Sequence, residues 1–282
     1  VDKFIGTEKT ITIRPRDVKV EEWCDLLGQP VYSPQGHILS EAIEALTHKD
    51  FSIENLIDYI KDEDNWTNIP DVSRHTLVYR LTDYLKTKIF DPVGPSATDL
   101  LTKNTCHLLM LRELRNQDKS LITAVIARQL FSAMGKMHAQ KKQAKFFDRA
   151  YKGPDLPNKV WLFIDEAHVV APRNEESPAR AALTEYVKRG RDAGLSLVMA
   201  TQQPSAVDDR ILSQVNVCIN HRLTFDADIV AAVNRIPSKA IQRMKVGGTS
   251  YNNFGDMIRL LGPGNAFVSD SSTSRSIMVQ VD

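Results

Sequence analysis

The chain has 282 residues, of which 42% are hydrophobic, and a formal net charge of +1. This length and apolar content suffice for one large core or two smaller ones, and the composition is not that of a disordered or fibrous protein. No apolar run approaches the roughly 20 residues of a membrane helix, and no export signal opens the chain, so we expect no membrane partner. The small net charge excludes a globally basic nucleic-acid-binding protein and leaves only a local basic stripe or loop for that role.

Cysteine usage points to a reducing compartment. Cys24, Cys106 and Cys218 are odd in number, widely spaced and free of any Cys-x-x-Cys pattern. This predicts neither a disulfide framework nor a zinc site. We therefore expect a cytoplasmic protein.

The first third of the chain predicts a short core segment followed by helices. Residues 1–35 are expected to add a strand and a turn to the core, with a strand at 10–13 and a helix around Trp23. Residues 36–95 carry apolar side chains at helical spacing, which predicts a helical subdomain whose role is packing. The turn cluster at 91–95 marks its end.

Residues 96–282 are expected to form the main α/β core. A buried strand at 105–111, an amphipathic helix at 118–139 and a second buried strand at 160–165 predict a parallel βαβ unit. Further strands are expected at 195–200, 215–222, 265–269 and 276–281.

Polar side chains follow two of these apolar strands. Asp165 and Glu166 end one strand, and Gln202 ends the next. A charge at the edge of a sheet core costs several kcal/mol unless it is paired or bound to a metal. We predict that Asp165 holds Mg²⁺ through its water shell, that Glu166 polarises the water that attacks the γ-phosphate of ATP, and that Gln202 senses that phosphate. The alternative is a capped strand end with an ion pair, for example to Arg191.

The glycine-rich phosphate loop that such a site needs is absent from this sequence. Gly-x-x-x-x-Gly-Lys-Ser/Thr occurs nowhere: Gly135-Lys136 is followed by Met137 and has Leu130 in place of the first glycine, and 247–250 has no lysine. The chain is therefore either a degenerate NTPase or a fragment whose loop lies upstream of Val1, and we favour the fragment. On its own the segment is expected to be inactive, because phosphate positioning carries most of phosphoryl-transfer catalysis.

A basic segment with interleaved aromatic residues lies between the predicted long helix and the strand at 160–165. It is either a surface that contacts DNA phosphates or a solvated loop, and the charge run by itself favours the loop. Its cationic residues are Lys141, Lys142, Lys145, Arg149, Lys152 and Lys159, and its aromatic residues are Phe146, Phe147 and Tyr151.

Four sequence blocks then occur in a specific order. They are Ile-Asp-Glu-Ala-His at 164–168, Lys-Arg-Gly-Arg-Asp-Ala-Gly at 188–194, Ala-Thr-Gln-Gln-Pro-Ser at 200–205 and Ser-Gln-Val-Asn at 213–216. In this order they resemble the HerA branch of the HerA/FtsK ATPases, strongly from about residue 100 onward and weakly before it. The resemblance implies an α/β RecA-like P-loop NTPase core with a mainly parallel sheet and an inserted helical subdomain. The chain is then the C-terminal portion, which lacks the P-loop.

The resemblance also implies a function. HerA proteins are hexameric ring motors that hydrolyse ATP with Mg²⁺ to translocate along double-stranded DNA, often with a nuclease or another effector. By this resemblance Arg191 is the arginine finger that reaches a neighbouring subunit's nucleotide, with Arg189 and Arg222 as rivals. Gln203 stands where the family commonly has an arginine, so no role is carried over to it.

Two alternatives remain beside the ATP-driven translocase. Asp-Glu-Ala-His also occurs in superfamily 2 helicases, which carry Ser-Ala-Thr rather than Ala-Thr-Gln-Gln. The second alternative is a catalytically silent ATPase-like subunit that scaffolds a partner. The translocase and the silent subunit differ in whether an intact P-loop precedes Val1.

His168 is expected to be a coupling residue rather than a metal ligand, because no second histidine lies four residues away.

Overall fold

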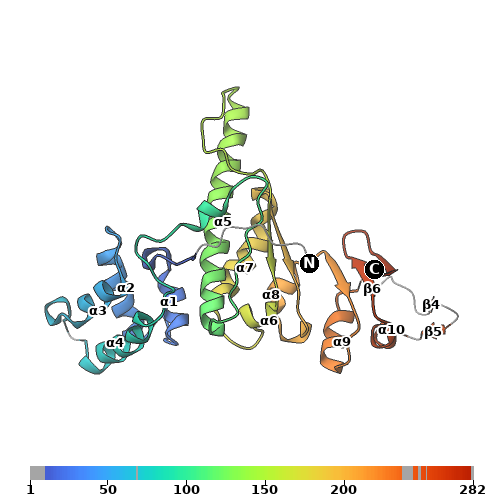
Figure 1. Ribbon diagram of the computed structural model, residues 1–282, viewed down its shortest axis with the longest axis horizontal. Helices are drawn as coiled ribbons and strands as arrows, with labels where there is room; N and C mark the ends of the chain where they lie inside the picture. The colour runs from blue at the N-terminus through green and yellow to red at the C-terminus, as the bar shows by residue number, and fades with distance from the viewer. Residues whose placement is uncertain (1–9, 68, 237–243, 247–248, 252, 281–282) are drawn as a thin grey trace. The chain divides into compact units, whose positions relative to one another are not determined.

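The computed structural model describes residues 10–67, 69–236, 244–246, 249–251 and 253–280 (Figure 1). The chain divides into two compact units: unit 1 comprises Val1–Leu162 and Glu176–Val198, and unit 2 comprises Phe163–Glu175 and Met199–Asp282. Two strands, β1 (Val160–Ile164) and β2 (Leu195–Met199), each begin in unit 1 and end in unit 2.

Unit 1 is mainly helical. Its α-helices are α1 (Val20–Leu26), α2 (Pro34–Leu46), α3 (Ile53–Lys61), α4 (Asp71–Leu85), α5 (Asn116–Phe146) and α7 (Pro178–Arg189). Short 3₁₀ turns are η1 (Pro15–Asp17), η2 (Glu63–Asn65), η3 (Ala97–Leu100) and η4 (Gly190–Ala193). None of the helices of the described residues is long and apolar enough to cross a bilayer.

Helices α3 and α4 lie within the segment predicted to be a helical subdomain, and α2 begins two residues before it. Local capping explains where α2 and α3 begin. Ser33 accepts a hydrogen bond from the N–H of Gly36 at 3.1 Å, with Pro34 in the first helical position. Ser52 and Asn55 form a reciprocal capping box. The three helices pack on one another through fully buried side chains, namely Ile38, Leu39, Leu56, Ile60, Leu77 and Leu81. The limits 1–35, 36–95 and 96–282 stay a prediction.

Helix α5 is the element against which the rest of unit 1 packs. It contacts α1 and α7, and Ser120 on α5 accepts a hydrogen bond from the N–H of Ala179 in the first turn of α7. Arg115 donates to the buried carboxylate of Asp118 at 2.9 Å, and the hydroxyl of Tyr84 on α4 donates to the same carboxylate at 3.3 Å. Burial raises the pKa of Tyr84 well above its usual range, so this hydroxyl keeps its proton and remains a donor.

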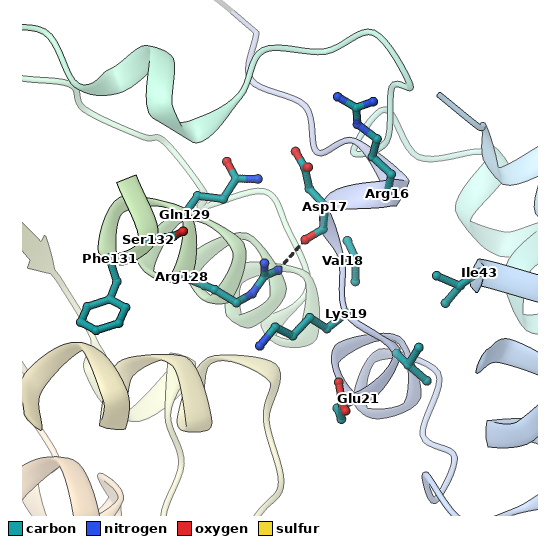
Figure 2. Close-up of a pocket in the computed structure, with 11 residues that line it drawn as sticks. Arg16, Asp17, Val18, Lys19, Glu21, Ile43, Arg128, Gln129, Phe131 and Ser132 are labelled. Carbon is teal, nitrogen blue, oxygen red and sulfur yellow. Dashed lines mark hydrogen bonds between the residues drawn. The ribbon is translucent and has the colours of Figure 1, made fainter. Parts of the chain in front are cut away.

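A second polar lock joins α5 to α1. Arg128 donates to both carboxylate oxygens of Glu22, at 3.0 and 2.8 Å, and also to the carbonyl oxygen of Asp17. Figure 2 shows this guanidinium pointing toward Asp17 in a cavity of about 730 Å³ that Arg16 and Lys19 also line. The cavity contains none of the predicted site residues, and Nε and Nη2 of Arg128 are already bound to Glu22 and Asp17. We therefore attribute it to packing around the lock rather than to chemistry.

One predicted element of this region is wrong. Residues 105–111 form no strand and are largely exposed, with Leu108 66% and Met110 73% accessible. The predicted βαβ unit therefore lacks its first strand: the apolar composition favoured burial, but no strand pairs with this segment among the described residues. The expected strand at 10–13 is reduced to a single parallel bridge between Ile13 and Phe90. Helix α5 starts close to its predicted start but continues to Phe146 rather than ending near 139.

Unit 2 combines short helices with antiparallel strands. Strands β3 (Val217–Asn220), β6 (Asn265–Asp270) and β7 (Arg275–Gln280) form one antiparallel sheet in that order, and β4 (Met244–Val246) pairs with β5 (Thr249–Tyr251). The helices are α6 (Ala167–Val170), α8 (Asp209–Leu212), α9 (Asp226–Val233) and α10 (Phe254–Leu260), with a 3₁₀ turn η5 at Pro204–Ala206. The core joins α9, α10 and β6 through Ala232, Met257, Ile258 and Phe267.

Strands β1 and β2 run parallel. The N–H of Val160 donates to the carbonyl of Gly194, and the N–H of Ala200 donates to the carbonyl of Ile164, so residue numbers rise together along both strands. The expected parallel sheet is represented among the described residues by this pair. The prediction that β1 is buried is wrong, because Trp161 and Phe163 on one of its faces are 60% and 69% exposed.

The lock between α1 and α5 gives a stability prediction. Arg128→Ala leaves Glu22 buried without its partner, and we expect a loss of about 2 to 4 kcal/mol. Urea unfolding followed by the fluorescence of the buried Trp23 measures it. Arg112→Ala is the matched control, because Arg112 and Glu113 are both highly exposed, and a change below about 0.5 kcal/mol is expected. Equal effects of the two substitutions would contradict the role of the lock.

Candidate functional site

Backbone hydrogen bonds bring the carboxyl ends of β1 and β2 together within unit 2. The N–H of Ala200 donates to the carbonyl of Ile164, and the carbonyl of Ala200 accepts from the N–H of Ala167, both at 2.9 Å. Residues that follow β1 therefore face residues that follow β2. Side chains from both strand ends can meet at this edge.

Glu166 and Gln202, both predicted site residues, are in direct contact. The side-chain amide Nε2 of Gln202 donates to Oε1 of Glu166 at 2.8 Å. Asp165 lies next to them, and its Oδ1 accepts a hydrogen bond from the N–H of Glu166 at 2.9 Å. Three of the four predicted site residues thus share one edge.

The expectation that both carboxylates lie at the edge of a buried core is wrong. Asp165 is exposed and the side chain of Glu166 is 40% exposed, so the pair does not pay a large desolvation penalty at a core edge. The Asp165 bond to the Glu166 N–H is also what a capped strand end would show. The contact between Glu166 and Gln202 carries the site instead, because it joins two strand ends.

His168 lies beside the carboxylate of Glu166. Its Nδ1 is 2.9 Å from the hydroxyl Oγ1 of Thr201 and 3.3 Å from Oε2 of Glu166. Oε2 is buried and accepts no hydrogen bond from the described residues. When Nδ1 of His168 accepts the hydroxyl proton of Thr201, this nitrogen carries no proton that it could donate to Glu166. Oε2 of Glu166 therefore receives no hydrogen bond from Nδ1, although the two atoms are 3.3 Å apart. Thus one carboxylate oxygen is held by Gln202 and the other keeps its lone pairs.

The backbone of Glu166 is held in the left-handed region. Its φ is 50° and its ψ 50°, a conformation that costs a non-glycine residue of order 1 kcal/mol or more. Glu166 is also the N-cap of α6, so the turn from strand to helix passes through it. The sharp turn directs the carboxylate toward the end of β2.

The loop that carries Gln202 is fixed at its far end. The carboxylate of Asp228 in α9 is buried and accepts from the N–H of Ser205 at 3.0 Å and from its hydroxyl at 2.7 Å. Arg173 donates to the carbonyl of Ser205 at 3.1 Å and pairs with Asp209. The loop after β2 is therefore held to α9 and to the segment after α6.

The three candidate arginines differ in how they are engaged. Arg189 in unit 1 pairs with Glu185 at 2.9 Å and lies over the ring of Phe131. Arg191 in unit 1 and Arg222 in unit 2 are exposed, and neither makes an ion pair or side-chain hydrogen bond with the described residues. Arg191 and Arg222 are thus available for a contact in another molecule, whereas Arg189 is occupied.

The side chains at this edge suit Mg²⁺ in the presence of a phosphate ligand. Asp165 and Glu166 supply oxygen donors, which Mg²⁺ prefers, and Oε2 of Glu166 is an unbonded buried acceptor. No group of three or more acidic, histidine or cysteine residues in the described parts of the chain could hold a metal by itself.

Comparisons with known proteins point to the same family as the motifs. A family model described as "Helicase HerA, central domain" matches residues 2–130. The chain is 25% identical over 260 residues to the "DNA double-strand break repair helicase HerA" of Pyrococcus furiosus, with 77% of this chain and 46% of that protein covered. It is 22% identical over 227 residues to the "Probable helicase MJ1565" of Methanocaldococcus jannaschii, with 74% and 41% covered. The resemblance to the HerA-type ATPases is confirmed.

Solved structures support the fold of this HerA-like chain. The bacterial conjugative coupling protein TrwB is similar with a TM-score of 0.60 at 13% identity, over 98% of this chain and 71% of that one. A second TrwB structure, in complex with ADP and Mg²⁺, gives a TM-score of 0.58 at 15% identity, over 96% and 69%. The predicted fold class, an α/β P-loop NTPase core, is confirmed.

The family model covers a different part of the HerA-like chain from the motifs. It ends at residue 130, whereas the four sequence blocks lie between 164 and 216, so the part where we expected a weak resemblance carries the match. The chain spans less than half the length of the two curated relatives. The roles of Asp165, Glu166, Gln202 and Arg191 remain predictions.

Several residues of this site were missed in the sequence. Thr201 and Ser205 lie in the Ala-Thr-Gln-Gln-Pro-Ser block, but nothing in the sequence showed that their hydroxyls bond to His168 and Asp228. Asp228 itself is 26 positions after Gln202 with no local motif. A buried acid in the first turn of a helix is the only signal it could have offered.

The left-handed backbone of Glu166 gives a prediction that separates strain from side-chain contacts. Glu166→Gly and Glu166→Ala both remove the carboxylate, but only glycine adopts a φ of 50° without cost. We expect the glycine variant to be more stable than the alanine variant by about 1 kcal/mol in thermal or urea unfolding.

The matched control is the same pair of substitutions at Glu185 in the middle of α7. There, glycine is expected to be less stable than alanine by about 1 kcal/mol, because it weakens a helix interior. An alanine advantage at both positions would show that Glu166 does not need a left-handed backbone.

Proposed function

We propose that this chain is part of an ATP-driven DNA translocase of the HerA type. The observation that carries the proposal is the 2.8 Å hydrogen bond between Gln202 and Glu166, next to Asp165, at the carboxyl ends of two parallel strands. Ligands of open α/β sheets bind outside the carboxyl ends of parallel strands. The HerA resemblance supports the nucleotide and the DNA as the two ligands.

In this proposal each residue at the edge has one task. Asp165 would hold Mg²⁺, with Glu166 as its neighbour. When bound, Mg²⁺ neutralises charge on the phosphate oxygens. Gln202 fixes Oε1 of Glu166, and its remaining N–H contacts the γ-phosphate as a sensor. The given sequence contains no Gly-x-x-x-x-Gly-Lys-Ser/Thr loop, so none of its residues is assigned to the phosphate cradle.

Glu166 is the general base of the proposed reaction. In the proposed step the carboxylate of Glu166 accepts a proton of the attacking water while the water oxygen bonds to the γ-phosphorus. The bond between that phosphorus and the oxygen that bridges to ADP breaks, and the products are ADP and inorganic phosphate. The hold of Gln202 on Oε1 keeps the acceptor oxygen from rotating away.

The finer parts of the proposal rest on the family. We infer a homohexameric ring that acts on double-stranded DNA together with a nuclease or another effector protein. The name of the Pyrococcus furiosus relative, a double-strand break repair helicase, supports the DNA substrate. In such a ring Arg191 is the finger for the neighbouring nucleotide, by the resemblance of its Gly-Arg block to the HerA family. It is exposed and makes no ion pair with the described residues, whereas Arg189 is bound to Glu185.

The first test is a pair of substitutions in the full-length protein. Glu166→Gln should preserve ATP binding and reduce turnover by about 10²-fold or more, because the amide has the same shape but cannot accept a proton. Asp165→Ala should instead weaken the binding of Mg-nucleotide. Binding is measured with a fluorescent ATP analogue and turnover by phosphate release. Full turnover in Glu166→Gln would end the assignment of the general base, and a full-length protein without a P-loop would favour the silent scaffold.

The second test asks whether Arg191 acts across a subunit interface. Arg191→Ala should reduce turnover by about 10³-fold and leave ring formation and ATP binding intact. Mixing it with Glu166→Gln should restore part of the activity, because some interfaces then pair an intact Glu166 with a neighbour's intact Arg191. Arg210→Ala, an exposed arginine in α8, is the control and should keep full turnover.

Inactivity of mixed rings that demonstrably form would rule out the trans role of Arg191. Arg222 would then be the next candidate, since it is also exposed and unpaired among the described residues. Arg189 would rank behind it, because a finger role would require it to leave Glu185.

A further inference from the structure

The end of α5 and the segment that follows it form a projection that we name the basic spur, residues 138–159. Met137 is the last buried residue of α5, and none of the residues of the basic spur is buried. Figure 1 shows the final turns of α5 standing apart, with the following segment running back alongside them. Its conformation therefore owes little to core packing.

Local contacts hold the basic spur in a defined shape. Lys141 donates to the side chain of Asn158 at 2.7 Å and lies over the ring of Tyr151, which joins the helix to the returning segment. The N–H of Arg149 donates to the carbonyl of Ala144 at 2.8 Å, and Asp148 ends the helix with a φ of 52°. The segment after α5 is thus an exposed loop, as the charge run favoured, but local contacts give it a defined course.

The basic spur concentrates positive charge in a nearly neutral chain. It has six lysine and arginine residues and two aspartates, a net charge of +4 in a chain with a total of +1, so the remainder carries −3. Asp155 is paired with Lys103 from outside the basic spur, which lowers the pKa of Asp155 and occupies its charge. The exposed lysines without an ion pair or side-chain hydrogen bond among the described residues are Lys142, Lys145, Lys152 and Lys159.

Helix energetics do not explain this arrangement. The helix dipole favours cations only in the last turn, where Lys145 lies. Lys141 and Lys142 lie four and three residues before Lys145, and like charges at these spacings destabilise a helix. A polyanion that contacts all three would remove this repulsion.

Two aromatic side chains at the tip point to the same kind of ligand. Phe146 is 83% exposed and Phe147 is 54% exposed, and they contact each other edge to face at 5.1 Å. The guanidinium of Arg149 lies 5.6 Å from the Phe147 ring. Cations that contact phosphates beside aromatic rings that stack on bases or wedge between them are the chemistry of nucleic-acid binding.

We propose that the basic spur is a DNA-binding surface, in which its lysines contact backbone phosphates and Phe146 and Phe147 contact bases. The inference rests on the proposed function for its choice of DNA. It adds to it a specific contact surface made of residues other than Asp165, Glu166 and Gln202.

The test uses the full-length protein and a triple variant, Lys142→Ala, Lys145→Ala and Lys152→Ala. Fluorescence anisotropy with a labelled duplex and a labelled single strand is measured over a range of salt concentrations. We expect weaker binding and a log–log salt slope that is smaller by about one for each lysine removed, because each phosphate contact releases condensed counterions.

The control removes equal charge from exposed lysines elsewhere in unit 1 and should change the slope little; it combines Lys49→Ala, Lys86→Ala and Lys88→Ala. Phe146→Ala with Phe147→Ala should weaken binding with an unchanged slope, and more for the single strand than for the duplex, since unpaired bases stack more readily.

The outcomes separate this inference from the proposed function. In one outcome the protein hydrolyses ATP with DNA stimulation, but the triple variant and the control have the same DNA affinity and salt slope. This result would overturn the DNA-binding role of the basic spur and would leave the proposed translocase function unaffected. Lysine-dependent DNA binding without any ATP hydrolysis would support the basic spur and overturn the translocase. Unchanged DNA binding with loss of a co-purifying acidic protein would show that the surface binds protein instead.

Discussion

The parallel pairing of β1 and β2 at their carboxyl ends is the constraint on which the candidate site depends. Two backbone hydrogen bonds of Ala200 fix which residue after β1 lies opposite which residue after β2: its N–H donates to the carbonyl of Ile164, and its carbonyl accepts from the N–H of Ala167. Only this register places the carboxylate of Glu166 within 2.8 Å of the Gln202 amide. A shift by one residue would turn every side chain of one strand to the opposite face and separate the two groups.

Residues outside the motifs maintain this geometry. Glu166 holds an unfavourable left-handed backbone, and such strain persists only where the surroundings determine the conformation. Those surroundings include the hydrogen bond from the N–H of Ala167 to the carbonyl of Ala200. They also include the hydrogen bond from the hydroxyl of Ser205 to the buried carboxylate of Asp228. The loop that carries Gln202 is therefore positioned by a helix more than twenty residues away. Its orientation belongs to unit 2 as a whole and not to the Ala-Thr-Gln-Gln block alone.

The sequence predicted the candidate site residues correctly where polar side chains end an apolar run. It was misleading where the burial of a segment had to be inferred from its apolar composition. Asp165, Glu166 and Gln202 were found because polar groups at the ends of apolar runs are unusual, and they do meet. The segment 105–111 failed because apolar content cannot tell whether a neighbouring strand exists, and Leu108 and Met110 are exposed. The link between Ser205 and Asp228 could not be predicted, since it joins distant residues with no shared pattern.

The chemistry of residue 202 explains why an amide suits this position. A glutamine side chain has two N–H donors and one acceptor, so it can hold Oε1 of Glu166 and still offer a donor to an anion. A glutamate there would place a second negative charge against Glu166, and an asparagine would be one methylene too short to keep the 2.8 Å contact from the same backbone. Under the proposed function, an anion that attracts the free donor of Gln202 also acts on the bond to Glu166. The residue that senses the phosphate is thereby the residue that orients the base, and both tasks depend on the single strand register described above.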